Sequence, residues 1–347
     1  MSFTITVQPA DRSFEVQDDE AILAAAIRQG IGLPHGCRDG ACGSCKSRLI
    51  SGRVVHGPHQ PKALSAAEEQ AGLILTCCGV PQTDCVIEAR SVPGADQYPV
   101  QKFPARVLAR EQVAADVIVL RLQLPGNQSL RYRAGQYVEV LLRDGVRRSY
   151  SMANAPHDLG DPPAIELHLR HLPGGRFTDH VFGAMQAKEI LRLEGPFGSF
   201  FLREASPKPI VLLAAGTGFA PIKAILGQMQ AKGIDRPTAL YWGGRRPHDL
   251  YLHAWCEQAA ARLPNLRYVP VVSDALPEDA WAGRDGFVHR AVMADLPDLS
   301  AHQVYACGSP AMVDAAQRDF TARCGLPADE FYADAFTSEA DKHPAAG

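Results

Sequence analysis

The stretch Cys37-Arg38-Asp39-Gly40-Ala41-Cys42-Gly43-Ser44-Cys45 decides the fold of the first part of the chain. Its three thiols follow the spacing C-x4-C-x2-C, and a fourth cysteine, Cys77, lies well downstream. Two irons that share two sulfides need four converging thiolates, so three of them must come from one tight loop. Gly40 and Gly43 permit positive φ values in that loop and let backbone N–H groups approach the cluster sulfurs. The spacing therefore predicts a [2Fe–2S] cluster with the ligands Cys37, Cys42, Cys45 and one downstream cysteine.

Two other interpretations of these cysteines are ordinary buried thiols and a zinc site. A zinc site more often has two C-x-x-C pairs or added histidines, and here only Cys42 and Cys45 are so spaced. Cys78 adjoins Cys77, and the spacing does not decide which of the two binds iron. We choose Cys77 because the stretch that ends at it, Leu-Ile-Leu-Thr-Cys, resembles the fourth-ligand strand of plant-type ferredoxins. Cys85 lies in an apolar run and is expected in the core.

Length and composition limit the class of protein. A chain of 347 residues is long enough for about two or three domains. A net charge of −3 argues against a broad nucleic-acid-binding surface, and no apolar run approaches the roughly 18 residues that span a bilayer. The start of the chain alternates like a strand and lacks the features of a signal peptide. We therefore expect a cytoplasmic protein that binds neither nucleic acid nor membrane, with its nine cysteines serving as metal ligands and buried thiols.

Local patterns in the N-terminal part predict a small mixed domain. The start reads as a hairpin, and Asp18–Gln29 has the acidic beginning and alanine-rich middle of a helix. A capping box at Ser65–Glu68 opens a second helix, and a strand is expected to carry Cys77. This order resembles the β-grasp ferredoxin domain, which we place at residues 1–92, followed by a linker at residues 93–102.

From Phe103 the sequence predicts a series of short strands, and after Pro209 it predicts strands that alternate with helices. Short strands separated by turn residues indicate an antiparallel barrel. The predicted strands are Arg106–Leu108, Val117–Leu124, Gln136–Leu142, Arg148–Met152, Ile165–His171 and Ile190–Glu194. After Pro209, strands alternate with helices, which implies a parallel, doubly wound sheet. The fold class is therefore multidomain α+β: a β-grasp ferredoxin domain, an antiparallel β-barrel at residues 103–205 and an α/β doubly wound domain at residues 206–340.

Two motifs in the barrel segment point to a flavin. Arg148-Ser149-Tyr150-Ser151 alone fits a surface strand with cross-strand pairs equally well. Gly174-Gly175-Arg176-Phe177-Thr178 ends a strand and opens a helix, where free backbone N–H groups bind phosphate. Together these motifs resemble the flavin-binding pair of the ferredoxin–NADP reductase superfamily. The resemblance implies FAD in this barrel, with Arg148, Gly174, Gly175 and Thr178 at the pyrophosphate, Tyr150 on the isoalloxazine or ribityl, and Ser151 near the reactive N5.

A third motif, Gly216-Thr217-Gly218-Phe219-Ala220-Pro221, follows a buried strand and opens the next helix. It lacks the third glycine of a dinucleotide fingerprint, so a tight turn without a ligand is the competing interpretation. The turns Tyr241–Arg245 and Cys307–Pro310 also follow predicted parallel strands, at whose carboxyl ends such sheets bind nucleotides. In the superfamily these three places form the nicotinamide site. The resemblance thus implies an NAD(P)H site made of Gly216, Thr217, Gly218, Pro221, Gly243, Cys307, Gly308 and Pro310.

The same resemblance makes Ser151 and Cys307 the catalytic residues, with Cys307 beside the nicotinamide. The alternative for Cys307 is a small buried hydrophobe, which is also what we expect of Cys256 and Cys324. Near the end of the chain, Asp334 and Phe336 match the family strand that brings an acidic or aromatic residue against the flavin. An edge strand with its ordinary packing is the other interpretation of that stretch.

The preference between NADH and NADPH stays open at this point. Arg245 and Arg246 have the chemistry to pair with a 2′-phosphate, although an arginine pair in a loop is usually just solvated. The family resemblance favours NADH.

Taken whole, the chain resembles reductase components that join an N-terminal ferredoxin domain to a flavin–nicotinamide module. Ile31–Cys37, Tyr241–Pro247 and Gly286–Arg290 are similar to the reductases of CDP-deoxysugar dehydratases. The resemblance implies a monomer that passes electrons from NADH through FAD to the cluster, and then singly to a partner enzyme. Our main hypothesis for the partner is a CDP-deoxysugar C3-dehydratase, and the alternative is an aromatic or alkyl mono- or dioxygenase component. A flavin and iron–sulfur redox-sensing protein is the hypothesis from another class.

Overall fold

The computed structural model describes residues 2–127 and 129–337. Of the described residues, one compact unit contains those up to Gln101, the segment Pro196–Ser199 and residues 335–337. The other contains Lys102–Gly195 and Phe200–Asp334. Among the helices that the structure describes, none is both long and apolar enough to cross a membrane.

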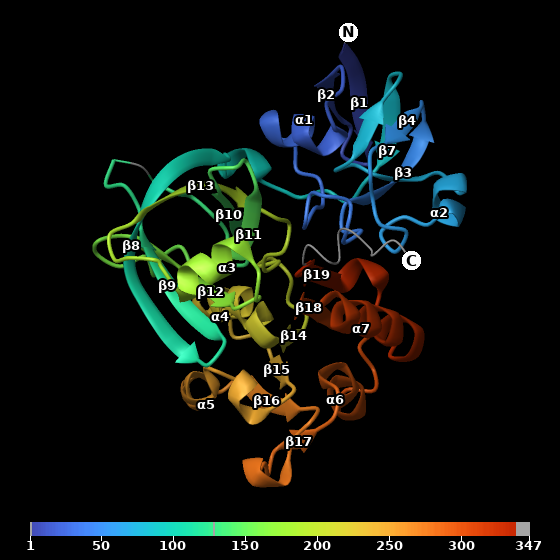
Figure 1. The fold of residues 1–347 in the computed structure, drawn as a ribbon. Helices are drawn as coiled ribbons and strands as arrows, with labels where there is room; N and C mark the ends of the chain where they lie inside the picture. The colour runs from blue at the N-terminus through green and yellow to red at the C-terminus, as the bar shows by residue number, and fades with distance from the viewer. Residues whose placement is uncertain (1, 128, 338–347) are drawn as a thin grey trace. The chain divides into compact units, whose positions relative to one another are not determined.

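The first unit is built on a five-stranded mixed sheet of order β2-β1-β7-β3-β5 (Figure 1). Its strands are β1 (Ser2–Gln8), β2 (Arg12–Gln17), β3 (Lys46–Ser51), β5 (Leu73–Leu75) and β7 (Cys85–Glu88). β1 pairs antiparallel with β2 and parallel with β7. Helix α1 (Ile22–Arg28) contributes Ile22 to a core that also contains Ile5 and Ile87. β4 (Val54–His56) and β6 (Gly79–Pro81) form a separate two-stranded sheet. The β-grasp ferredoxin domain is confirmed.

The start of one helix of this unit agrees with the sequence prediction, and the start of the other does not. The capping box at Ser65 and Glu68 is confirmed and opens α2 (Ala66–Gln70). Helix α1, however, begins at Ile22, so the predicted start at Asp18 is wrong. Asp19 has a positive φ of 61°, and the Glu20 carboxylate accepts a hydrogen bond from Gln17 N–H at 3.0 Å. The acidic residues therefore build the turn before the helix rather than its first turn.

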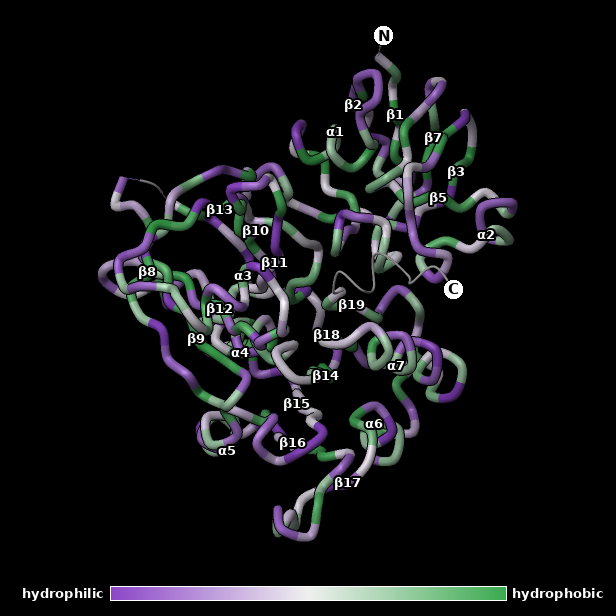
Figure 2. The backbone as a smooth tube through the Cα atoms, in the orientation of Figure 1, coloured by the Kyte–Doolittle hydropathy of each residue, from purple (hydrophilic) through white to green (hydrophobic). Residues whose placement is uncertain are grey.

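The second unit begins with a six-stranded antiparallel barrel of order β11-β10-β13-β8-β9-β12. Its strands are β8 (Gln101–Ala114), β9 (Val117–Gln123), β10 (Tyr137–Leu141), β11 (Arg147–Ser151), β12 (Ala164–Arg170) and β13 (Ile190–Phe197). A bridge between Met152 and Leu167 joins the two outer strands, which closes the barrel. Figure 2 shows the hydrophobic stretch of β9, which supplies Ile118, Leu120 and Leu122 to the barrel core. Helix α3 (Arg176–Phe182) follows β12.

The same unit continues into a parallel sheet of order β17-β16-β15-β14-β18-β19. Its strands are β14 (Ile210–Ala215), β15 (Thr238–Gly244), β16 (Leu266–Val272), β17 (Arg284–Asp285), β18 (Gln303–Gly308) and β19 (Phe331–Ala335). The helices are α4 (Phe219–Ala231), α5 (His253–Arg262), α6 (Val288–Asp295) and α7 (Pro310–Arg323), with α4 and α5 on one side of the sheet in Figure 1 and α6 and α7 on the other. β14 pairs parallel with both β15 and β18. The strand order therefore reverses at β14, which is where such sheets bind nucleotides.

Candidate functional site

The loop of the first three cysteines is shaped by backbone groups that point at sulfur. Cys37 N–H donates to Cys42 Sγ at 3.4 Å, and Cys42 N–H donates back to Cys37 Sγ at 3.3 Å. Gly40 and Gly43 have φ values of 75° and 76°, and a Cβ on Gly40 would lie 2.9 Å from His59 Cβ. The glycines are therefore required, as the spacing predicted, and the amide groups are available to stabilise thiolates.

The four predicted ligands interact in two pairs, Cys37 with Cys42 and Cys45 with Cys77. Hydrogen bonds from Cys37, Ser44 and the backbone lower the pKa of Cys42 to about 6 against the opposing effect of burial. The pKa of Cys37 is raised because its thiol shares a hydrogen bond with Cys42 and is buried. Cys77 raises the pKa of Cys45 in the same way. In each pair the two sulfur atoms are therefore close enough to share a hydrogen bond.

This arrangement fits a two-iron cluster better than a single zinc ion. Each iron of a four-cysteine [2Fe–2S] cluster takes two thiolates, which the two pairs supply.

The structure places Cys77 in the turn after β5 rather than on a strand as expected. Its hydrogen bond with Cys45 lowers its pKa, but the neighbouring thiol of Cys78 and burial outweigh that effect and raise the pKa to about 12. The Gly40 backbone N–H also bonds to the Cys77 sulfur. Cys78 Sγ lies 4.0 Å from Leu75 O and shares a hydrogen bond with the Cys77 thiol, which lowers the pKa of Cys78. These contacts favour Cys77 over Cys78 as the fourth ligand, and Cys85 lies in the core as expected.

In the barrel, the end of β11 lies beside the first turn of α3. The ring centroids of Tyr150 and Phe177 are 5.5 Å apart, and burial raises the pKa of Tyr150. A Cβ on Gly175 would lie 2.7 Å from Leu172 O, so the chain must have glycine where it turns into the helix. Thr178 Oγ1 donates to Leu172 O at 3.0 Å. The hydroxyl of Thr178 therefore closes the loop, and its proton is already engaged within the protein.

Ser151, Cys307 and Asp334 come together from three strands that are far apart in sequence. Ser151 Oγ donates to Asp334 Oδ2 at 3.2 Å, and both residues are buried. Cys307 is fully buried at the end of β18, and burial, together with the charge of Asp334, raises its pKa well above the ordinary value. Phe336 follows β19 and belongs to the first unit. The buried-thiol interpretation of Cys256 and Cys324 agrees with their positions.

The loops after β14 and β18 touch through their backbones. A Cβ on Gly218 would lie 2.7 Å from Gly308 Cα, and a Cβ on Gly308 would lie 2.8 Å from Ala215 O. The turn Gly216–Gly218 is one turn of 3-10 helix that leads into α4, whose first turn buries Pro221. Trp242 on β15 stacks on Phe219 with 4.0 Å between ring centroids and donates from Nε1 to Gly216 O at 3.0 Å. The predicted nucleotide residues are thus brought to one edge of the sheet.

Arg170, which the sequence analysis missed, points at this edge. It ends β12, and its Nη1 lies 3.3 Å from Asp116 Oδ2 and 3.5 Å from Asp249 Oδ1. Its Nε and Nη2 are buried and have no hydrogen-bond partner among the residues that the structure describes, and a Cβ on Gly216 would lie 3.6 Å from Nη2. Unpaired buried donors are costly, so this guanidinium suits an anionic ligand beside Gly216. The only signal in the sequence was an arginine at the end of a predicted strand.

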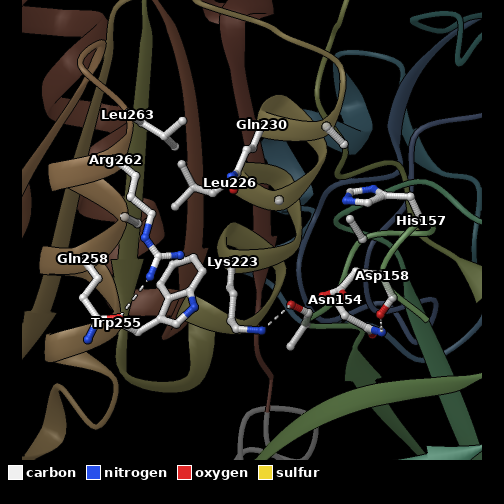
Figure 3. Close-up of a pocket in the computed structure, with 15 residues that line it drawn as sticks. Asn154, His157, Asp158, Lys223, Leu226, Gln230, Trp255, Gln258, Arg262 and Leu263 are labelled. Carbon is white, nitrogen blue, oxygen red and sulfur yellow. Dashed lines mark hydrogen bonds between the residues drawn. The ribbon is translucent and has the colours of Figure 1, made fainter. Parts of the chain in front are cut away.

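A pocket of about 550 Å³ lies elsewhere, between the segment after β11 and helices α4 and α5. Figure 3 shows Lys223 reaching across it toward the backbone of that segment, where Nζ lies 3.4 Å from Ala153 O. Its Nζ is also 3.0 Å from the Glu166 carboxylate. None of the residues predicted for the cofactors lines this pocket, so it is separate from the nucleotide edge.

Comparison with known proteins covers nearly the whole chain. Residues 5–82 match the 2Fe-2S iron-sulfur cluster binding domain, residues 104–202 the oxidoreductase FAD-binding domain and residues 212–318 the oxidoreductase NAD-binding domain. The chain is 39% identical over 336 residues to CDP-6-deoxy-L-threo-D-glycero-4-hexulose-3-dehydrase reductase of Yersinia pseudotuberculosis, covering 97% of this chain and 99% of that protein. It is 36% identical to reductase component 2 of terephthalate 1,2-dioxygenase from Comamonas sp., covering 99% of this chain and 100% of that protein. The crystal structure of an Amycolatopsis cytochrome P450 reductase matches with a TM-score of 0.79 and 33% identity, covering 97% of this chain and 99% of that one.

Proposed function

The chain belongs to the ferredoxin–NADP reductase superfamily, among reductases with iron–sulfur, FAD-binding and NAD-binding domains, and on this premise we propose that its electron acceptor is a deoxysugar dehydratase. The observation that carries the proposal is the 39% identity, over nearly the full length of both chains, to a reductase named for a CDP-deoxyhexulose dehydrase. The 36% identity to an oxygenase reductase component keeps an oxygenase as the second candidate acceptor.

The protein is an oxidoreductase that passes electrons from a nicotinamide nucleotide through FAD to a [2Fe–2S] cluster and on to a partner. A bound flavin supplies the exchange between a hydride donor and a carrier of single electrons. The contribution of the chain is to bind these groups, to orient them and to exclude water. A redox-sensing role without turnover is disfavoured, since it would not need the complete nucleotide edge.

Cys37, Cys42, Cys45 and Cys77 would hold the cluster, because they form two thiol pairs within reach of backbone N–H groups. Arg148, Tyr150, Gly174, Gly175 and Thr178 would hold FAD. Tyr150 offers a ring face beside Phe177, and Gly175 lets the chain turn into α3, since a Cβ there would clash with Leu172 O. Since Thr178 already donates its proton to Leu172 O, its part is to shape the turn. Phe336 remains a proposed contact of the flavin.

Ser151 and Cys307 would face the reacting atoms. The Ser151 hydroxyl is held in place by its hydrogen bond to Asp334, which would position it beside the flavin edge. Cys307 stays a neutral thiol at working pH because its pKa is raised well above the ordinary value. It therefore serves as a compact, water-excluding wall for the nicotinamide and not as a nucleophile.

The nucleotide would lie over Gly216–Gly218, Pro221, Gly243, Gly308 and Pro310, at the edge where the strand order reverses. Arg170 joins this set as a residue that would bind the pyrophosphate. Its two unpaired donors, Nε and Nη2, match the geometry of a phosphate oxygen pair.

We further propose that the protein is a monomer and that it is cytoplasmic. None of the nine cysteines forms a disulfide, which fits a reducing compartment. Size-exclusion chromatography with light scattering would test the monomer, and a mass of two chains would overturn it.

Two experiments test the proposed function. Anaerobic titration of the purified holoprotein with NADH should bleach both flavin and iron–sulfur absorbance, and an unreduced cluster beside a bleached flavin would contradict the electron path. Adding a CDP-deoxyhexulose dehydrase with its substrate should then accelerate NADH consumption. Acceleration by an oxygenase component, but not by the dehydrase, would overturn the choice of partner.

A further inference from the structure

The segment after β15 lies where dinucleotide-binding sheets distinguish their coenzymes. In such sheets, the end of the strand that follows the glycine-rich turn reads the adenosine ribose. An acidic residue there binds the 2′-hydroxyl, and an arginine accepts the 2′-phosphate. In this chain β15 ends at Gly244, and Arg245 and Arg246 follow it directly. The sequence alone therefore leaves NADPH open as a substrate.

The side chain of Arg246 is already engaged by a carboxylate. Its Nε lies 2.7 Å from Asp279 Oδ2, and its Nη2 lies 2.9 Å from Asp279 Oδ1. This is the bidentate geometry in which arginine binds carboxylates and phosphates most strongly. The side chains are 27% and 14% exposed, so the pair is partly shielded from water. Glu278 adds a second carboxylate at 3.9 Å.

Asp279 is held in place independently of this pair. It ends the short 3-10 turn Pro277–Asp279, and its Oδ2 also accepts a hydrogen bond from Leu276 N–H at 2.9 Å. The loop after β16 is tied to the loop after β15, because Ser273 N–H donates to Gly244 O at 3.0 Å and Asp274 N–H donates to Arg245 O at 2.8 Å. The carboxylate is therefore a fixed part of this edge.

The backbone donors beside Arg246 are engaged as well. Asp249 Oδ2 accepts from the N–H groups of Arg245 and Arg246 at 2.8 and 3.0 Å. An incoming 2′-phosphate would meet no free amide at these two positions and would face the carboxylates of Glu278 and Asp279. Arg245 is exposed, and attraction by one exposed guanidinium is weakened by solvent.

We propose that Asp279 determines the coenzyme preference by occupying the guanidinium of Arg246, so that the protein uses NADH and discriminates against NADPH. This inference rests on the proposed function, because it requires the nucleotide to bind at the carboxyl edge of the sheet. The Arg246 guanidinium is in this sense a potential 2′-phosphate-binding group that is already occupied by Asp279. A ribose with a free 2′-hydroxyl does not need the Arg246 guanidinium, so the pairing of Arg246 with Asp279 does not weaken the binding of NADH.

The test compares kcat/KM for NADH and NADPH in the full-length holoprotein, with ferricyanide as acceptor. Asp279→Asn should raise kcat/KM for NADPH by about tenfold or more, equal to about 1.4 kcal/mol, and should change that for NADH by less than about twofold. Adding Arg246→Ala to Asp279→Asn should abolish the gain. The control is Asp274→Asn, which makes the same charge change on the same loop without touching Arg246 and should leave the preference unchanged.

A second readout does not depend on turnover. The competitive inhibitor 2′,5′-ADP should bind Asp279→Asn more tightly than the unmodified protein, with flavin content confirming that the variant folds. The inference would be overturned if the ratio of kcat/KM for NADPH to kcat/KM for NADH were unchanged in a folded Asp279→Asn protein. It would also be overturned if the gain in kcat/KM for NADPH persisted after Arg246→Ala was added. If neither nucleotide bleached the flavin of the unmodified protein, the proposed function itself would fail instead.

Discussion

Replacing Arg170 with methionine keeps most of the side-chain volume and removes the guanidinium beside Gly216. If this group binds the pyrophosphate, the variant should bind NADH more weakly and leave the rate of flavin reduction at saturation nearly unchanged. The reason is that the pyrophosphate is remote from the reacting atoms, so its contribution is the same in the ground state and the transition state.

The magnitude follows from the two unpaired donors, Nε and Nη2. A hydrogen bond to a charged group contributes about 1.5–3 kcal/mol, and loss of one bidentate contact in this range corresponds to a roughly 10- to 150-fold weaker affinity. The cost in folding should be small. The ion pairs of Arg170 with Asp116 and Asp249 are long, at 3.3 and 3.5 Å, and the variant no longer buries two unpaired donors.

Stopped-flow reduction of the flavin over a range of NADH concentrations gives the dissociation constant and the limiting rate separately. Arg170→Lys, which keeps the charge but not the planar fork, should lie between the methionine variant and the unmodified protein. The matched control is Arg192→Met, which removes an exposed arginine from β13 and should have no effect on either quantity. An unchanged dissociation constant in a folded, flavin-loaded Arg170→Met protein would refute the assignment, and so would an equal loss in the control.

Three further predictions concern the cluster, the flavin edge and acid stability. Cys42→Ser should leave NADH-dependent bleaching of the flavin intact and abolish electron delivery to the partner, measured by NADH consumption with the acceptor; undiminished delivery without iron would contradict the pathway. Ser151→Ala should slow flavin reduction by about 10- to 100-fold at unchanged nucleotide affinity in stopped-flow measurements, because the hydroxyl is held at the reacting edge by Asp334, and an unaltered rate would remove its catalytic role. Burial raises the pKa of Glu166, but hydrogen bonds and charge from His168 and Lys223 outweigh it and lower the pKa from 4.5 to about 2. Its contribution of about 3 kcal/mol is therefore complete above pH 4.5 and is lost as the pH falls toward 2. When the free energy of unfolding is measured in urea between pH 3 and 7, Glu166→Gln should reduce its dependence on pH below about pH 4.5. An unchanged pH dependence would argue against this contribution of Glu166.

The architecture was predictable from the sequence because its signals are local. Cysteine spacing, glycine turns and the change from short strands to alternating strands and helices each depend on neighbouring residues. The roles of Ser151 and Cys307 were suggested only by the family resemblance, since the hydrogen bond of Ser151 to Asp334 and the influence of Asp334 on Cys307 join strands from separate parts of the chain.

Other features depend on contacts that no local pattern contains. The unpaired donors of Arg170 become visible only when β12 and the turn after β14 are placed side by side. The pairing of Arg246 with Asp279 joins two loops that are 33 residues apart. The start of α1 was misplaced because acidic residues favour both a first helical turn and the tight turn before it, and the positive φ of Asp19 decides for the latter.

The backbone contact between Gly218 and Gly308 limits how this protein can move and how it can be redesigned. With no room for even a methyl group at either position, the ends of β14 and β18 are in close backbone contact. We therefore expect any opening that admits or releases the nucleotide to hinge outside these two turns. Engineering of coenzyme choice has to work at the periphery, through side chains such as Asp279, and leave this junction intact.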